Sequence, residues 1–273
     1  MAKVKTKNRK KVDVNELVAY REAYGRQFGL IDYVKLVIFP GIAFAILATA
    51  VLYTPIVSIV FFAIVVMYGY TFLMPNVIRK EYEGESFRER NKFINNMTQI
   101  MTDENKTVPM ALGIAKVRAK GEFQDDITRL EAQLFGSDVP GIQDAFDVMS
   151  DKYEDDPIFT QYMEQLETAA IEGNTNAETL KDIKGYHNQM KTKQEVYEGQ
   201  KKAHLGDMKS MLFTVSVFIG ALTFSFGFDT YLNAFAHAWA GRITGGMYLM
   251  MMLMFVRQFS GFLFDDSVTS TKK

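Results

Sequence analysis

"HLGDMKSMLFTVSVFIGALTFSFGF", residues 204–228, is the stretch that decides the fold, because a polar segment runs into a purely apolar one without a break. Residues 211–228 contain no Asp, Glu, Lys or Arg, and the residues before them are rich in Lys, Gln and Glu. There is no proline between Ala177 and Phe228. A helix needs about 20 apolar residues to cross a bilayer. The stretch therefore predicts one long helix that starts in water and continues into a membrane.

The charged residues of the chain are segregated, although its totals resemble those of a soluble protein. The 273 residues have a net charge of −1 and are 48% hydrophobic. Residues 36–74 contain no charged side chain, whereas residues 76–210 hold 18 Lys or Arg and 25 Asp or Glu. Apolar length predicts four transmembrane helices. They are residues 36–53, 56–74, 211–228 and 243–264, with the turn signal Thr54-Pro55 between the first two.

The basic N-terminus predicts the orientation of these spans. Its first eleven residues carry six basic side chains and no acidic one, and such segments stay on the inner side of a membrane. Four spans then leave both termini and the central region in the cytoplasm, as expected of a multi-pass protein of the cell (inner) membrane. The basic residues either bind anionic lipid at the membrane surface or only set the topology. They are Lys3, Lys5, Lys7, Arg9, Lys10 and Lys11.

The predicted domains follow from these spans. A basic N-terminus with an amphipathic interfacial helix (1–35) leads into a transmembrane hairpin (36–75). A cytoplasmic helical domain (76–210), a second transmembrane pair (211–264) and a cytoplasmic tail (265–273) follow. In the interfacial helix Asp13 is a candidate cap, and one rough apolar stripe is expected to face the membrane. It consists of Leu17, Tyr24, Phe28 and Ile31.

The central region predicts helices only. Apolar residues recur at helical spacing, as in Phe123, Ile127, Leu130 and Leu134. Short connections make consecutive helices antiparallel neighbours. The predicted fold class is therefore an all-α membrane protein, with four transmembrane helices and a cytoplasmic antiparallel bundle of about six helices.

Helix ends in this region are marked by specific residues. Gly136 and Gly173 are predicted stops, and Asp156 followed by Pro157 predicts a helix start. The capping box Thr175–Glu178 is predicted to begin the last helix. Without a break to Phe228, that helix has a length of about 80 Å at 1.5 Å per residue. It joins the central region to the third span.

Sequence motifs for catalysis are missing. There is no GxxxxGK[ST] phosphate loop, no HExxH zinc motif and no GxSxG elbow, and the chain has no cysteine. The histidines His187, His204 and His237 are scattered, and His187 lies on a helical stripe that predicts packing rather than metal binding. We therefore expect no enzyme, no cofactor, no metal and no nucleic-acid partner.

An acidic segment is the first candidate site. Asp144, Asp147, Asp151 and Glu154 follow helical spacing, and Lys152 is the only basic residue near them. On a helix such acids repel one another. They are either a solvated face or a docking surface for a basic partner or a divalent cation.

A charged residue in the fourth span is the second candidate. Arg257 lies seven residues before the end of the apolar stretch at Phe264. Near the inner end of a span its guanidinium reaches the interface by snorkelling. The alternative is a polar contact with another span or subunit.

Three segments carry a resemblance to a known family. "FINNMTQIMTDENKTVPMALGIAK" (93–116), "PGIQDAFDVMSDKY" (140–153) and "MEQLETAAIEGNTNAETLKDIKGYH" (163–187), with two spans on either side, resemble the inner-membrane platform proteins of type II secretion and type IV filament machines. The chain is most similar to their single-domain Tad-type members. Asn105 and Asn174 stand where that family has Gly, and Asn is the side chain that best replaces Gly in a left-handed turn.

The resemblance implies a non-enzymatic scaffold that anchors pilin assembly. As partners it implies a cytoplasmic secretion ATPase, pilin subunits, and a paralogous platform protein or further copies of the chain. Other readings remain: a scaffold of a conjugation or other secretion apparatus, a small transporter or channel, or an integral-membrane enzyme. Against a transporter, the spans offer few polar groups besides Arg257 and Gln258.

Overall fold

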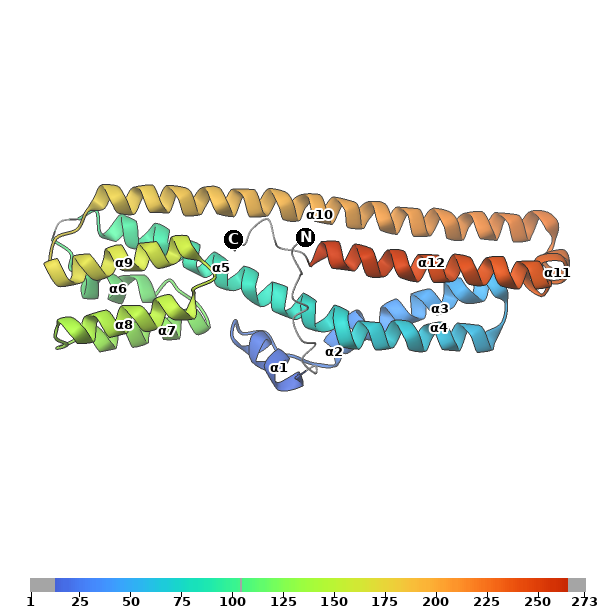
Figure 1. The fold of residues 1–273 in the computed structure, drawn as a ribbon, viewed down its shortest axis with the longest axis horizontal. Coiled ribbons are helices and arrows are strands. Elements are labelled where there is room, and N and C mark those ends of the chain that lie inside the picture. Colours follow the sequence, from blue (N-terminus) through green and yellow to red (C-terminus); the bar gives the residue numbers. More distant parts are fainter. Residues whose placement is uncertain (1–12, 104, 265–273) are drawn as a thin grey trace, which may run out of the picture. The chain divides into compact units, whose positions relative to one another are not determined.

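A computed structural model describes residues 13–103 and 105–264, and every regular element in them is a helix (Figure 1). Four of these helices are long and apolar enough to cross a membrane. The predicted spans lie within them to within two residues at their ends, so the prediction of an all-helical chain with four such helices is confirmed. They are Leu30–Leu52, Pro55–Ile100, Ala177–Phe226 and Trp239–Leu263.

The chain divides into two compact units. The first, the membrane unit, contains α1 (Val14–Glu22) and residues Arg26–Lys80 and His204–Phe264. The second, the helical domain, contains Glu81–Ala203 and the short segment Ala23–Gly25. Two helices, α5 (Met74–Ile100) and α10 (Ala177–Phe226), contribute residues to both units.

In the membrane unit, π-helical turns join neighbouring α-helices into longer continuous helices. Thus α2, η1 and α3 form one helix, and α4, η2 and α5 form another. The bounds are α2 (Leu30–Tyr33), η1 (Val34–Ile38), α3 (Phe39–Leu52), α4 (Pro55–Tyr68), η2 (Gly69–Leu73), α5 (Met74–Ile100), α10 (Ala177–Phe226), α11 (Phe228–Tyr231), η3 (Leu232–Ala236) and α12 (Trp239–Leu263).

The apolar helices α3, α4 and α12 pack through a core of mostly large apolar side chains and, where two helices approach most closely, through glycine. Helices α3 and α4 form a hairpin whose turn places Tyr53 in the left-handed region, with φ of 48°. Helix α12 packs against α3 at Gly245, where an added Cβ would lie 2.6 Å from Cδ2 of Leu52. Glycine lets the two helix backbones approach closely, as small residues do at the helix interfaces of membrane proteins.

The N-terminal helix is shorter than predicted. Helix α1 ends at Glu22, and Gly25 follows in the left-handed region with φ of 74°. Asp13 does act as a cap, because its Oδ1 accepts a hydrogen bond from the backbone N–H of Asn15 at 3.0 Å. The single amphipathic helix was wrong, since a glycine in this conformation ends the helix. Of its stripe only Leu17 lies in α1; Tyr24, Phe28 and Ile31 follow it.

Six helices, α5 to α10, contribute side chains to one hydrophobic core in the helical domain. Helix α6 packs against α7 and α9, and α8 packs against the same two helices. Helices α6 and α8 are therefore at opposite corners of a four-helix arrangement (Figure 1). The bounds are α6 (Val108–Lys116), α7 (Glu122–Leu134), α8 (Val139–Lys152) and α9 (Pro157–Glu172).

Several predicted helix ends are confirmed in this domain. Gly136 and Gly173 have φ of 73° and 70° just after α7 and α9. Asp156 caps α9, because its Oδ1 accepts a hydrogen bond from the backbone N–H of Phe159 at 3.2 Å. The short polar side chain satisfies a backbone donor that has no partner within the helix.

Helix α10 is continuous over 50 residues, Ala177–Phe226. Its cap is Asn176, whose Oδ1 accepts from the backbone N–H of Thr179 at 3.1 Å, so the prediction of a Thr175 cap was wrong. It ends two residues earlier than predicted, because Gly227 turns the chain with φ of 80°. No break interrupts the passage from the helical domain to the third span.

Candidate functional site

The four acidic residues Asp144, Asp147, Asp151 and Glu154 are all exposed. The first three lie on α8, where Ala145, Phe146 and Met149 are buried, and Glu154 follows the end of that helix. We call these four residues the acidic face. In the described part of the chain, no basic side chain forms an ion pair with any of them. Among the described residues these charges are therefore offset by solvent and not by an ion pair.

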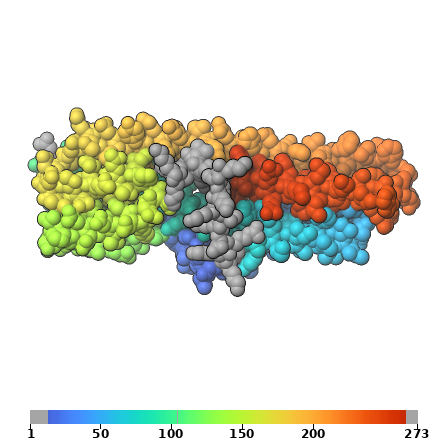
Figure 2. Space-filling model, viewed as in Figure 1, coloured from blue at the N-terminus to red at the C-terminus, as the bar shows by residue number. Residues whose placement is uncertain are grey.

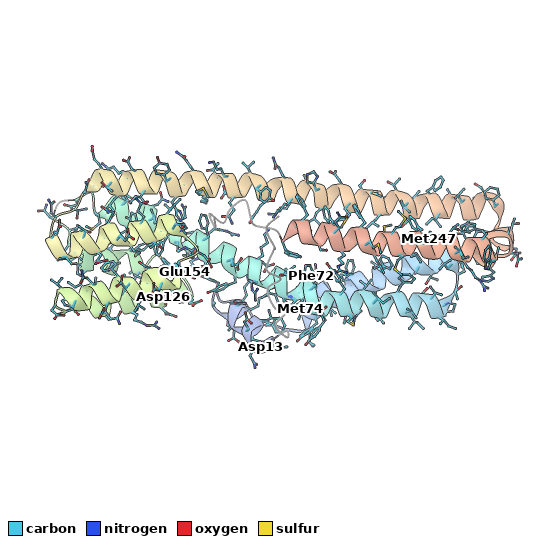
Figure 3. All side chains as sticks on the ribbon, viewed as in Figure 1. Asp13, Phe72, Met74, Asp126, Glu154 and Met247 are labelled. Carbon is cyan, nitrogen blue, oxygen red and sulfur yellow. The ribbon has the colours of Figure 1, made fainter. Side chains whose placement is uncertain are left out.

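Lys152, the one base expected to offset the acidic face, has other partners. Its Nζ lies 2.6 Å from Oε1 of Glu122 and 2.5 Å from Oδ2 of Asp126, both on α7. Oδ2 of Asp126 also accepts a hydrogen bond from the hydroxyl of Tyr153 at 2.7 Å. Figure 3 shows Asp126 near Glu154, beyond the end of α8. Lys152 thus joins α8 to α7 and does not neutralise the acidic face.

The acidic surface continues onto α9. Burial, together with the negative charges of Asp147 and Glu164, raises the pKa of the Glu167 carboxyl. The surfaces of α8 and α9 adjoin in Figure 2, where they are coloured yellow-green and yellow. Glu164 and Glu167 were not predicted as part of the surface, although they share one helix face at i, i+3 spacing.

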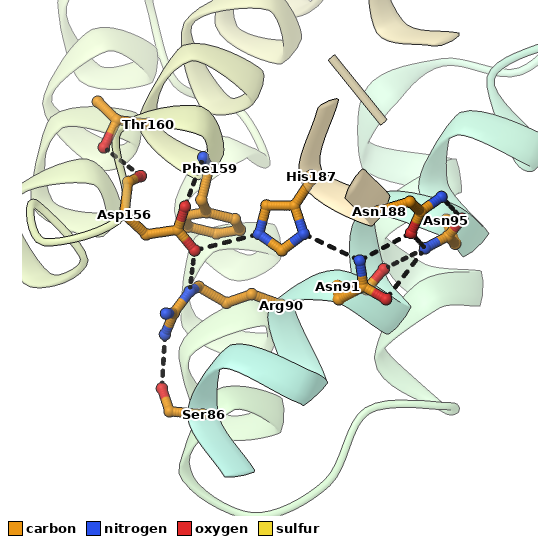
Figure 4. A network of polar contacts seen from close by, with 9 residues as sticks. All are labelled: Ser86, Arg90, Asn91, Asn95, Asp156, Phe159, Thr160, His187 and Asn188. Atoms are coloured by element: carbon orange, nitrogen blue, oxygen red, sulfur yellow. Dashed lines mark hydrogen bonds and ion pairs between the residues drawn. The ribbon is translucent and has the colours of Figure 1, made fainter. Parts of the chain in front are cut away.

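A buried network of polar side chains lies where α5, α9 and α10 meet (Figure 4). His187 of α10 is fully buried, and its Nε2 lies 3.1 Å from Oδ2 of Asp156. The same oxygen accepts a hydrogen bond from Nε of Arg90 at 2.9 Å. The Nδ2 amide of Asn91 lies 2.9 Å from Nδ1 of His187 and also donates to Oδ1 of Asn188 at 2.8 Å.

The charges in this network are balanced. Burial alone raises the pKa of the Asp156 carboxyl, but the hydrogen bond from His187 and the charge of Arg90 outweigh it and lower the pKa below its usual value. The Arg90 guanidinium also lies over the Tyr153 ring, 4.8 Å from its centroid. Since the Asn91 amide donates to Nδ1, the imidazole proton is assigned to Nε2.

This network is suited to holding helices together rather than to catalysis. His187 is 0% exposed and its ring stacks on Phe87, so no substrate reaches its nitrogens. Sequence analysis placed His187 correctly on a packed stripe but missed its partners. Arg90 and Asn91 lie almost one hundred residues away, and no local spacing signals such a contact.

Two predicted basic sites have different outcomes. Arg257 is exposed on α12, near Tyr68 of α4, and no ion pair with an acid is found for it among the described residues. Lys80, which was not a predicted site, donates a hydrogen bond to the backbone oxygen of Leu263, the last residue of α12, at 3.1 Å. The N-terminal set Lys3, Lys5, Lys7, Arg9, Lys10 and Lys11, like the tail 265–273, lies outside the described residues.

Comparison with known proteins finds a relative that matches over nearly its whole length. No family model and no solved structure matches the chain. An uncharacterized plasmid-encoded protein of Bacillus anthracis, pXO2-23, is 44% identical over 268 residues, which cover 98% of this chain and 97% of the relative. The chain therefore belongs to the same protein family as pXO2-23 of Bacillus anthracis.

Proposed function

We propose that the chain is a non-enzymatic platform protein of the cell (inner) membrane. It couples a cytoplasmic secretion ATPase to pilin assembly in a type II secretion or Tad-like pilus machine. The helical domain and both termini lie in the cytoplasm in this proposal, as the basic N-terminus favours.

The observation that carries the proposal is the continuity of two helices. The helices Pro55–Ile100 and Ala177–Phe226 each contain an apolar stretch long enough to cross a membrane and residues that pack in the helical domain. A Gly/Ser-rich linker would let the domain move independently of the spans. Two unbroken helices instead favour a role in which a partner's movement reaches the membrane.

The acidic face is the proposed docking surface of this platform. Its four carboxylates are exposed, and complementary charge speeds and orients association with a basic protein. The described residues contain no group of three or more His, Cys, Asp or Glu side chains placed to hold a metal ion. A basic protein surface, such as one on the ATPase, is therefore preferred to a divalent cation.

A scaffold of a conjugation apparatus is the second candidate. The observation that favours it is the plasmid location of the relative pXO2-23. The same continuous helices serve either machine, so the two candidates differ in their partners and not in the physical role of the chain.

Purification of the tagged full-length chain from its host in mild detergent tests the proposal. We expect a secretion ATPase and pilin subunits among the co-purified proteins, identified by mass spectrometry against a tagged unrelated membrane protein. Recovery of conjugation proteins instead selects the second candidate. Absence of both sets, together with solute flux through the chain in liposomes, contradicts the scaffold role.

A further inference from the structure

Helix α6 has an apolar ridge that nothing in the described chain covers. Met110, Ile114 and Val117 follow each other at i, i+4 and i+7, and they are 60%, 41% and 76% exposed. The opposite side of α6 is buried in the core through Ala111 and Leu112. Since a surface helix usually turns polar side chains to water, this second apolar side indicates a contact with another protein.

The segment that carries this ridge is basic along its own sequence. Residues 106–120 contain four basic residues and no acidic one. Lys116 is paired with Glu131 of α7. For Lys106, Arg118 and Lys120, no ion pair with an acid is found among the described residues. A surface that complements the ridge therefore has apolar side chains at its centre and acidic side chains at its border.

The acidic face of α8 has this chemistry. Val148 is 57% exposed. It follows Asp144 by four residues, and Asp151 follows Asp144 by seven, so the three side chains share one side of the helix. Asp147 adds a further exposed carboxylate beside it. The apolar centre and acidic border complement the α6 ridge in both hydrophobicity and charge.

One molecule does not join these two faces itself, because α6 and α8 occupy opposite corners of the α6–α9 arrangement. We propose that the α6 ridge of one copy binds the acidic face of a second copy. Each copy then offers one free face of each kind, so the contact is heterologous and builds a closed ring or a chain of copies. This inference names a second copy, in place of the ATPase, as the basic partner of the acidic face, and it rests on the proposed function only for the shared membrane orientation of all copies.

Cysteine cross-linking in native membranes tests the contact directly, because the chain contains no cysteine. One copy carries Val117→Cys and a differently tagged copy carries Val148→Cys. We expect a short bis-maleimide to join the two tags, and neither variant to cross-link when expressed alone. Val196→Cys, on an exposed residue of α10, replaces Val148→Cys as the matched control and is expected to give no product.

Exchange of charges adds a rescue to this test. Arg118→Glu with Lys120→Glu in the Val117→Cys copy is expected to lower the yield about tenfold, because like charges then face each other. Asp147→Lys with Asp151→Lys in the Val148→Cys copy is expected to restore it. A restored cross-linked product would contain both altered copies and so would show that both are folded. The lower yield of the first pair would then be due to a lost contact and not to misfolding.

Three outcomes overturn the inference. Cross-links only between identical cysteines indicate a two-fold contact, and no cross-link between copies indicates that the chain does not pair through these faces. Cross-linking of Val117→Cys to a different protein assigns the ridge to that protein. The purification experiment gives a separate result. If the ATPase co-purifies but no cross-link forms between copies, this contact is rejected and the platform function is retained.

Discussion

Nε2 of His187 lies 3.1 Å from Oδ2 of Asp156, so a residue in the long helix α10 is bonded to the residue that caps α9. Arg90 of α5 donates to the same carboxylate oxygen. One buried carboxylate thus fixes three helices of the helical domain, two of which also contain a stretch long and apolar enough to cross a membrane. The stability of this domain is therefore expected to depend on Asp156.

Asp156→Asn is expected to destabilise the helical domain by about 3 kcal/mol, because it leaves Arg90 buried without its counter-ion. The change keeps the cap, since Asn caps helices about as well as Asp. Asp138→Asn is the matched control, because Asp138 caps α8 from an exposed position. Thermal unfolding of the purified protein in detergent, followed by circular dichroism, checks this. Equal melting temperatures for the two variants would contradict the role of the network.

The contribution of Asp156 is also expected to depend on pH. The pKa of this carboxyl in the folded protein is below its ordinary value of 3.8. Its stabilising effect is therefore fully present above pH 3.8 and is lost as the pH falls from there through the folded pKa. The difference in melting temperature between the wild type and Asp156→Asn is expected to stay constant from about pH 7 to pH 5 and to shrink below about pH 4. A difference that grows on acidification would show that another group is responsible.

The spans and most helix ends were predictable from the sequence because they depend on local features. The length of each apolar stretch was enough to predict the spans. Gly136 and Gly173 end helices because glycine readily adopts the left-handed conformation. The N-terminal helix was mispredicted because its apolar spacing continued past Gly25, which ends it. In α10 the predicted cap was Thr175, whereas the backbone path makes the next residue, Asn176, the cap.

The candidate site was predictable in part. The spacing was enough to place Asp144, Asp147 and Asp151 on the exposed side of α8, whereas Glu154, also exposed, lies just beyond the end of that helix. The partners of Lys152 were missed, because Glu122 and Asp126 belong to α7 and meet Lys152 only through tertiary packing. The contact of Asp156 with His187 was missed for the same reason.

Gly121→Ala is expected to loosen the segment Ala23–Gly25 from the helical domain. Gly121 has φ of 61° and ψ of −149°, and an added Cβ would lie 2.2 Å from the backbone oxygen of Ala23. That oxygen accepts a hydrogen bond from the backbone N–H of Glu122 at 2.8 Å. We expect faster proteolysis after residues 23–25 than in the wild type.

Gly136→Ala controls for backbone strain, because Gly136 has φ of 73° but no atom within 4 Å of the added Cβ. This change is expected to cost about 1–2 kcal/mol from the left-handed conformation alone. It should leave the cleavage rate of the N-terminal segment unchanged. Equal acceleration by both variants would mean that the close approach at Ala23 does not hold the segment.

Gly206→Pro is expected to abolish filament assembly or secretion without preventing insertion. Gly206 lies inside α10, where proline removes a backbone hydrogen bond and costs about 3 kcal/mol or more. Gly206→Ala is the matched control, because no atom lies within 4 Å of its Cβ and alanine favours the helix. Membrane fractionation and a filament or secretion assay check this. Normal assembly by the proline variant would argue against transmission through an unbroken α10.

The central claim, a membrane platform whose helical domain lies in the cytoplasm, is tested most directly by labelling single cysteines with an impermeant maleimide. Asn233→Cys lies in η3, between the third and fourth spans, and Val196→Cys lies on an exposed residue of the helical domain. The label is applied to intact cells, or to spheroplasts if the cells have an outer envelope that blocks the reagent. We expect Asn233→Cys to react under these conditions and Val196→Cys to react only after permeabilisation. Labelling of Val196→Cys before permeabilisation, with Asn233→Cys protected, would contradict the account.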